Sequence, residues 1–278
     1  MVRRGARKWA RLRRSNRTRG RASKEAMVRL DEGGRAAQDV RLIAPAPSLR
    51  PWVRHVSIQP GPARHAPWRV VPDTSAHVIF SLVHGTPRCR IVGARSTYAD
   101  IDVADRAFTV AVRLQPGALP GLVRDTASAL TDRAVDIVDV MGSRAPCAAD
   151  LADMAPVEAG RALLRAIERR CAETPPPFAA TALAHVSRVD DLAQAWGLSA
   201  RRAHARIVDA VGLSPKRALR IRRLHATLRS VGAGQSLAAA AMLAGYSDQA
   251  HFTRDARDLL GEPPGTWFRR ADFFKPVR

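Results

Sequence analysis

Residues 236–268 read SLAAAAMLAGYSDQAHFTRDARDLLGEPPGTWF and predict two short helices around a tight turn. The turn falls at Gly245, because glycine enters the positive-φ region without steric cost. Ser247 or Asp248 can cap the free N–H groups that open the second helix. That helix should end at Gly261, which two prolines follow closely. The pattern is that of a helix-turn-helix, whose second helix can enter the major groove of DNA.

The same stretch resembles the signature of AraC/XylS-type transcription regulators. The residues that carry the resemblance are Gly245-Tyr246-Ser247, Phe252, Arg254, Gly261, Pro264 and Trp267. That family has two such motifs joined by a long helix, and a second copy does lie upstream. It comprises Asp191-Leu192-Ala193 to Trp196, the turn Gly197-Leu198-Ser199, and a helix from Ala200 to Val211 that ends at Gly212. The resemblance covers roughly the last third of the chain and implies a DNA-binding regulator that is not an enzyme and needs no cofactor.

The first recognition helix should present a basic outward face. On a helical wheel, Ala203 and Ile207 share the inward face, which leaves Arg201 and His204 outward. Arginine binds guanine O6 and N7 with two hydrogen bonds, so Arg201 is a candidate for reading a base. Two further arginines are expected to contact phosphates, which fix the register without reading sequence. The predicted DNA contacts are Arg201, Arg202, His204 and Arg206.

The second motif should pair a buried scaffold helix with its recognition helix. Leu237 to Leu243 is apolar nearly all round, as in a buried helix; the alternative is a packing helix in an unrelated bundle. In the recognition helix, Phe252 should point inward, and Gln249 near the N-terminus suits an adenine edge. His251 fits a DNA contact and a structural role equally well. The predicted DNA contacts are Gln249, His251 and Arg254.

A long helix should hold the two motifs apart. Leu213-Ser214-Pro215 is a start signal, since proline at the first helical position loses no hydrogen bond. A helix from there to about Arg229 would be a rod of roughly 22 Å. The two recognition helices could then reach successive turns of the major groove, which lie roughly 34 Å apart. A further helix is predicted from Phe178 to Ser187, and residues 261–267 should pack back onto the second motif.

Residues 40–142 predict a different architecture, because apolar alternation and turn residues recur at short intervals. They favour a small antiparallel barrel or sandwich. A short helix is expected from Leu119 to Leu130. Residues 134–140 resemble a segment that docks onto another part of the fold. The fold class is therefore α+β, with a β-rich barrel or sandwich followed by an all-α domain. The predicted strands are His77 to Val83, Arg90 to Gly93, Tyr98 to Val103 and Phe108 to Leu114.

The β-rich region is similar to the N-terminal regulatory domains of AraC-type proteins. Val71-Pro72-Asp73 and Val112 to Gly117 resemble one subgroup whose ligand is generally not known. The resemblance makes Asp73, His77 and Arg113 candidate pocket residues for a small effector, and the alternative is a surface or turn role for each. The histidines are scattered and form no His-x-His pair, so we expect no metal site.

Ala148 to Cys171 has helical periodicity, with apolar residues on one face and arginines on the other. The family resemblance suggests a role in dimerisation, whereas packing onto its own β-domain would explain the pattern equally well. Prolines then end the helix and form a stiff spacer, which predicts a domain boundary. The predicted division is a basic arm at 1–26, a sensor domain at 27–173, a linker at 174–177 and a DNA-binding domain at 178–278.

The net charge of +21 is concentrated at the two ends of the chain. Residues 1–26 hold eleven Lys or Arg and one acid, and residues 182–278 hold sixteen against eight. A basic excess on helix-turn-helix motifs favours attraction to DNA phosphates. Double-stranded DNA is the expected partner, with a small effector, RNA polymerase and a second copy of the chain as further candidates. No apolar run is long enough for a membrane, so we expect a cytoplasmic, nucleoid-associated protein.

Residues 1–26 contain almost no side chains that could form a core, so we expect them to be disordered. They are either a basic arm that follows DNA phosphates or translated upstream sequence, with Met27 as the true start. No apolar segment follows Arg3 and Arg4, so no secretory signal is expected.

Two other functions compete with a ligand-sensing regulator. One is an enzyme, such as a repair alkyltransferase, targeted by a DNA-binding module, and it would need a reactive cysteine in an electropositive pocket. Cys89, Cys147 and Cys171 are widely spaced without a motif for that role, so reduced structural thiols are expected. The other is a DNA-binding protein whose N-terminal domain senses nothing.

Overall fold

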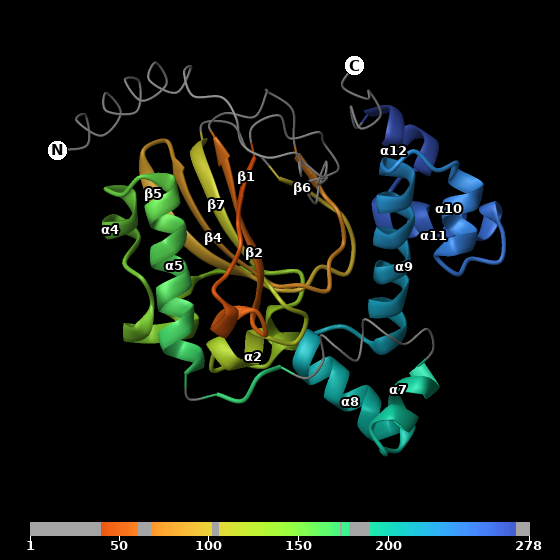
Figure 1. Cartoon of the computed structure of the whole chain (residues 1–278), viewed down its shortest axis with the longest axis horizontal. Helices are drawn as coiled ribbons and strands as arrows, with labels where there is room; N and C mark the ends of the chain where they lie inside the picture. The colour runs from red at the N-terminus through yellow and green to blue at the C-terminus, as the bar shows by residue number, and fades with distance from the viewer. Residues whose placement is uncertain (1–39, 61–67, 102–105, 173, 178–188, 271–278) are drawn as a thin grey trace.

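The computed structural model describes residues 40–60, 68–101, 106–172, 174–177 and 189–270. The basic arm predicted at 1–26 and the helix predicted from Phe178 to Ser187 lie outside these residues. Figure 1 shows a sheet with helices beside it, here called the sheet half (40–172), and an all-helical part, the helical half (189–270). This order of a β-rich part before a helical part confirms the predicted α+β class.

A six-stranded antiparallel sheet forms the sheet half, in the order β1-β2-β7-β4-β5-β8. The β4–β5 hairpin turns at His84 and Gly85, whose φ angles of 49° and 76° suit a two-residue hairpin turn. A second sheet pairs β3 (Trp68–Val70) with β6 (Ala99–Ile101). The six strands are β1 (Arg41–Ile43), β2 (Val53–Pro60), β4 (His77–Val83), β5 (Thr86–Val92), β7 (Arg106–Leu114) and β8 (Ala134–Asp136).

The main sheet is open, so the barrel that the strand pattern allowed is wrong. Its edge strands β1 and β8 have three residues each, and within the described ranges they do not pair with one another. The helix α5 (Pro156–Cys171) instead packs across β2 and β7, and Figure 1 shows it beside the main sheet. A sheet that buries an apolar face under a helix has no need to close on itself.

The helix α5 packs its apolar face on its own sheet. Leu163 and Ile167 are 0% and 2% exposed. The helix lies close to the sheet at Gly160, because a Cβ added there would lie 3.3 Å from the side chain of Val56 and 3.5 Å from that of Val110. Intramolecular packing, one of the two roles expected for this segment, is therefore confirmed. The stretch from Ala148 to Cys171, which has one continuous helical pattern in the sequence, forms two helices. The first is α4 (Ala148–Ala152), and Pro156 then begins α5.

The shorter elements differ more from the predicted bounds. The helix expected from Leu119 to Leu130 is two elements, α2 (Leu119–Leu122) and the 3-10 helix η2 (Ala127–Leu130). The segment at 134–140 is strand β8 followed by α3 (Ile137–Met141). Two further 3-10 turns are η1 (Pro47–Leu49) and η3 (Gly142–Arg144).

The helical half holds the two motifs and the long helix between them. The observed bounds of α8 and α10 match the predicted ones, and α9 continues three residues beyond Arg229. The eighteen residues of α9 give a length of about 27 Å, and α9 stands between the motifs in Figure 1. The helices are α7 (Val189–Ala195), α8 (Ala200–Val211), α9 (Pro215–Gly232), α10 (Leu237–Leu243), α11 (Gln249–Leu260) and α12 (Pro264–Arg270).

Local sequence signals begin and end these helices. The side chains of Ser199 and Ser214 each accept a backbone N–H at the starts of α8 and α9. Gly212 and Gly261 end α8 and α11 with φ angles of 84° and 76°, in the left-handed region that favours glycine. These start and stop positions are the ones that the sequence predicts.

The two halves share a hydrophobic cluster. Most of its members come from α8, α9 and α11, but Val71 and Ala94 belong to the sheet half, and each is only 1% exposed. A separate cluster fills the space between the main sheet and the helices of the sheet half. The helical half is thus packed against the sheet half.

Candidate nucleic-acid interface

The first motif consists of α7, a turn and α8. Gly197 lies in the turn with φ 59°. Ala203 and Ile207 are 1% and 0% exposed, as predicted, so α8 turns its basic side chains to solvent. The guanidinium of Arg206 lies 5.9 Å from the centroid of the Trp196 ring, a cation–π contact. The exposed basic side chains of α8 are Arg201, Arg202, His204 and Arg206.

The second motif repeats this arrangement in α10, a turn and α11. Gly245 occupies the turn with φ 87°. Phe252 is 0% exposed, whereas Gln249 and Arg254 are exposed. The inward and outward faces of α11 are therefore those predicted from the helical period.

His251 is half-buried, and its side chain contacts residues of the turn. Its ring stands edge-on to Tyr246 with centroids 5.2 Å apart, and its Nδ1 lies 3.1 Å from Ser247 Oγ. Its backbone N–H donates to Asp248 Oδ1 at 2.6 Å and holds the pKa of that carboxyl below its ordinary value. These contacts support the structural role that the sequence left open for His251, while a DNA contact from it stays a prediction.

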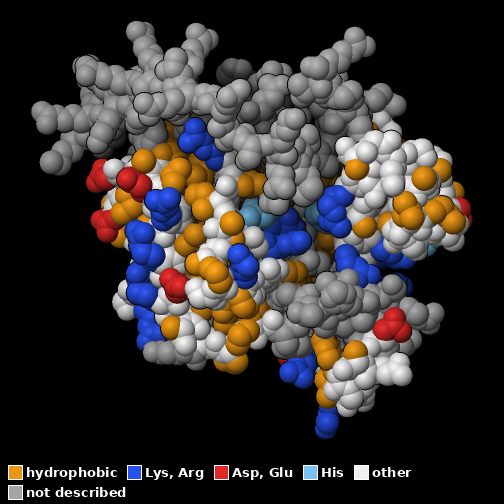
Figure 2. Space-filling view, viewed as in Figure 1, with side chains coloured by type: hydrophobic (Ala, Val, Ile, Leu, Met, Phe, Trp, Pro, Cys, Tyr) orange, Lys and Arg blue, Asp and Glu red, His pale blue; other side chains and the backbone are white. Residues whose placement is uncertain are grey.

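The scaffold helix α10 is not buried all round, and this expectation is wrong. Only Ala240 and Ala241 are buried, while Met242 and Leu243 are 57% and 70% exposed. A seven-residue helix that packs on α9 and α11 buries one side and leaves the other to solvent. Figure 2 shows hydrophobic side chains on this outer part of the helical half.

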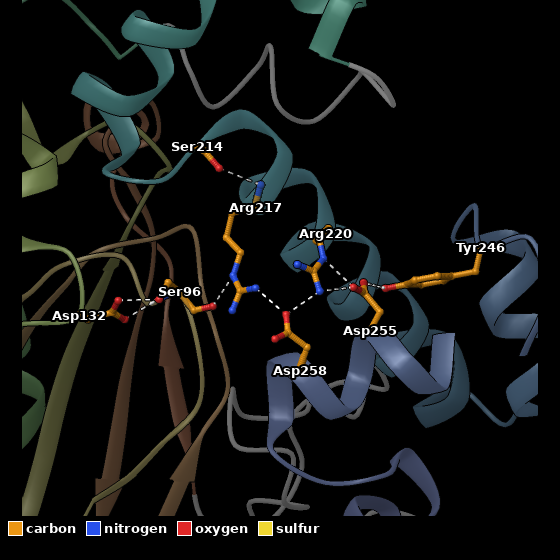
Figure 3. A network of polar contacts seen from close by, with 8 residues as sticks. All are labelled: Ser96, Asp132, Ser214, Arg217, Arg220, Tyr246, Asp255 and Asp258. Carbon is orange, nitrogen blue, oxygen red and sulfur yellow. Dashed lines mark hydrogen bonds and ion pairs between the residues drawn. The ribbon is translucent and has the colours of Figure 1, made fainter. Parts of the chain in front are cut away.

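A buried carboxylate fastens α11 to α9. Asp255 is 6% exposed and accepts hydrogen bonds from Tyr246 Oη at 2.8 Å and from Arg220 Nε at 2.6 Å (Figure 3). Burial alone would lower the pKa of Arg220, but its bonds to Asp255 and Asp258 raise it above the ordinary value. Burial, followed by the charge of Asp255, raises the pKa of Tyr246, so the phenol stays protonated as a donor.

Sequence reasoning missed this network, although one signal was present. Asp255 lies three residues after Phe252 and so shares its inward face. An acid on a buried face needs a partner, because an unpaired buried charge is costly. The basic residues of α9 could therefore have been assigned partly to α11 rather than wholly to solvent.

The three candidate effector residues do come together. His77 on β4 faces Arg113 on β7 in the strand register. Arg113 Nη2 donates to Asp73 Oδ1 at 2.8 Å, and His77 Nε2 lies 3.7 Å from Asp73 Oδ2. Asp73 is 4% exposed and also accepts a hydrogen bond from Ser75 N at 3.0 Å. The sequence could not show this convergence.

The helix α9 faces this cluster. His225 Nε2 lies 2.6 Å from Pro72 O, beside Asp73. Partial burial and then the charge of Arg113 lower the pKa of Arg229, one turn further along α9. Figure 2 shows Arg and His side chains gathered between the sheet half and the helical half. The candidate effector residues therefore lie where the two halves meet.

Neither a membrane span nor a metal centre is found within the described ranges. No helix there is long and apolar enough to cross a membrane. No group of three or more His, Cys, Asp or Glu side chains in the same ranges is placed to hold a metal ion.

Two family models match the chain. Residues 192–270 match the model of a helix-turn-helix domain, and residues 41–136 match that of a domain of unknown function (DUF6597). No curated protein and no solved structure gives a significant match. The helix-turn-helix match is of the AraC type, so an uncharacterised β-rich domain is followed here by a C-terminal domain of the AraC family, the DNA-binding domain of transcription regulators.

Proposed function

We propose that the protein regulates transcription by reading two successive segments of the DNA major groove, one with α8 and one with α11. The observation that carries the proposal is the repeated geometry of the two motifs. Each recognition helix begins at a capped N-terminus, buries one face in its motif and exposes polar residues on the other. The long helix α9 joins the motifs within one chain, which suits a non-palindromic site.

Base reading is assigned to Arg201 and Gln249, because both are exposed near the starts of their helices. Arginine suits guanine and glutamine suits adenine. Arg202 and Arg206 are assigned to phosphates, and the cation–π contact with Trp196 supports an oriented Arg206. The remaining proposed contacts are His204, His251 and Arg254.

The experiment selects sites from a random DNA pool with the full chain and then measures affinity by fluorescence anisotropy. The selected site should bind at least about 1,000-fold more tightly than a scrambled one. Affinity for both should fall steeply with salt, because phosphate contacts release counterions. Equal affinity for every sequence would rule the proposal out, whether or not the affinity falls with salt.

We also propose that Asp73, His77 and Arg113 bind a small effector. Two polar atoms support this: Asp73 Oδ2 and Ser75 Oγ are buried without a hydrogen-bond partner among the described residues, and native structures rarely leave such atoms unused. The position of the cluster against α9 would link an effector to the DNA-binding domain. A thermal-shift screen of metabolites tests this, with Asp73→Asn as the variant that should lose the shift.

A screen that finds no stabilising metabolite would favour the alternative in which the N-terminal domain senses nothing. The enzyme alternative is less well supported. Burial raises the pKa of the Cys89 and Cys171 thiols to about 12, whereas a nucleophilic cysteine needs a lowered pKa. A cytoplasmic location with the chromosome, a contact with RNA polymerase and a homodimer belong to the same proposal.

A further inference from the structure

The end of the first recognition helix rests on the sheet half. Thr131 Oγ1 donates to the carbonyl oxygen of Gly212, the residue that ends α8, at 2.7 Å. A Cβ added at Gly212 would overlap Thr131 Oγ1 and lie 2.7 Å from Ala127 O. The C-terminal end of α8 therefore lies so close to η2 that only a residue without a Cβ fits at this position.

The end of the second recognition helix rests on the same half. Tyr98 N donates to Leu259 O at 3.1 Å, and Arg69 Nη1 donates to Leu260 O at 3.3 Å. A Cβ added at Gly261, which ends α11, would overlap the Tyr98 ring. Arg69 holds that ring in place, with its guanidinium 4.4 Å from the ring centroid.

The two contact points are joined through the sheet half. Asp132, next to Thr131, accepts hydrogen bonds from Ser96 N at 2.8 Å and from Ser96 Oγ at 2.6 Å. Arg217 of α9 then donates to Ser96 O at 2.8 Å and to Asp258 of α11 at 2.6 Å, as Figure 3 shows. Residues 94–98 and 127–133, here called the clamp loops, thus touch both recognition helices and the helix between them.

The long helix alone does not fix the first motif. α8 packs more extensively on η2 of the sheet half than it does on α9. Two residues, Leu213 and Ser214, separate the cap of α8 from the start of α9. The orientation of α8 relative to α11 therefore depends on the clamp loops as well as on α9.

We infer that the clamp loops set the separation and orientation of the two recognition helices, and thereby determine which spacing of two DNA half-elements the protein accepts. Tyr98 and Thr131 act as positioning residues and need no DNA contact of their own. This inference rests on the proposed reading of two groove segments. Inserting one base pair rotates one half-element by about 35° about the DNA axis, which a rigid pair of helices cannot follow.

The first test measures the distance between the helices without DNA. Spin labels are placed on the exposed positions Ala205→Cys and Ala250→Cys of the full chain, with the exposed native thiol removed by Cys147→Ser. The parent should give one narrow distance distribution by electron paramagnetic resonance, and the double variant Tyr98→Ala/Thr131→Ala a broad one. Thr126→Ala is the matched control, because its side chain is exposed and its hydroxyl forms a hydrogen bond with the nearby Ser128. Coinciding distributions would overturn the inference.

The second test measures affinity for the selected DNA site with one base pair inserted between, or deleted from between, its half-elements. The parent and the control should bind the altered site about tenfold or more weakly, and the double variant less than about threefold more weakly. If parent and double variant lose affinity equally on the altered sites, and the double variant still unfolds cooperatively, the clamp loops do not set the accepted spacing. The proposed reading of two groove segments would then stand. A parent that shows no sequence preference at all would instead remove the proposed function, and the spacing claim with it.

Discussion

Tyr246 donates its hydroxyl hydrogen to Asp255 across the interior of the second motif, at 2.8 Å. Tyr246 belongs to the turn before α11, and Asp255 lies within α11, so the bond fixes the turn to the recognition helix. Arg220 binds the other oxygen of the same carboxylate from α9. One buried acid therefore holds together three parts of the DNA-binding domain.

Replacing the members of this network should have graded effects on stability. Asp255→Ala should lower the free energy of unfolding by about 3 kcal/mol, because it leaves Arg220 without its buried partner. Tyr246→Phe should cost about 1 kcal/mol, the value of one hydrogen bond. Asp258→Ala is the control and should cost under about 1 kcal/mol, because that side chain is 52% exposed. Urea unfolding of the full chain measures all three, and equal losses for Asp255→Ala and Asp258→Ala would contradict the role of burial.

The glycines that end the recognition helices should tolerate alanine poorly. Gly212→Ala and Gly261→Ala each combine a strained positive φ with overlap against the sheet half. Gly234→Ala is the matched control, since φ is 92° there and the space around an added Cβ is open. The control should lose about 1 kcal/mol from strain alone, and the two caps about 1–3 kcal/mol more. Thermal unfolding checks this, and three equal losses would mean that the packing of the helix ends on the sheet half is loose in solution.

Sequence predicts the elements of this protein better than their assembly. The bounds of α8 follow from Ser199 and Gly212, which cap the helix through backbone groups a few residues away. The contact between Arg217 and Ser96 joins residues 121 positions apart, and no local pattern reports it. For the same reason the open sheet and the exposed Met242 could not be foreseen, since both depend on which face another element covers.

The same contrast between local and long-range determinants applies to the candidate sites. Which side chains of α8 and α11 point outward follows from the helical period, and the structure confirms it for Arg201 and Gln249. The convergence of Asp73 with Arg113 depends on strand register, which a single sequence does not specify.

The buried thiols should make the protein less stable in alkali. In the unfolded chain a cysteine has a pKa of about 8.5, whereas burial raises the pKa of Cys89 and Cys171 to about 12. Between these values the unfolded state loses protons that the folded state keeps, so the free energy of unfolding falls as pH rises toward 12. Cys89→Ala should reduce the slope by about 1 kcal/mol per pH unit. Parallel slopes for variant and parent would show that Cys89 is accessible to water.

Arg201→Ala and Gln249→Ala should relax sequence preference at two different positions of the selected DNA site, one in each half-element. Each variant should bind the favoured base pair about 1–3 kcal/mol less tightly, because the substitution removes two hydrogen bonds to a base. Arg202→Ala is the control: removing a phosphate-binding side chain should weaken binding to all sequences alike and reduce the salt slope by about one. Selection from a random pool followed by anisotropy measures both effects. If Arg201→Ala and Gln249→Ala keep the parental preference while Arg202→Ala changes it, then α8 and α11 bind in a different register, with Arg202 facing the bases.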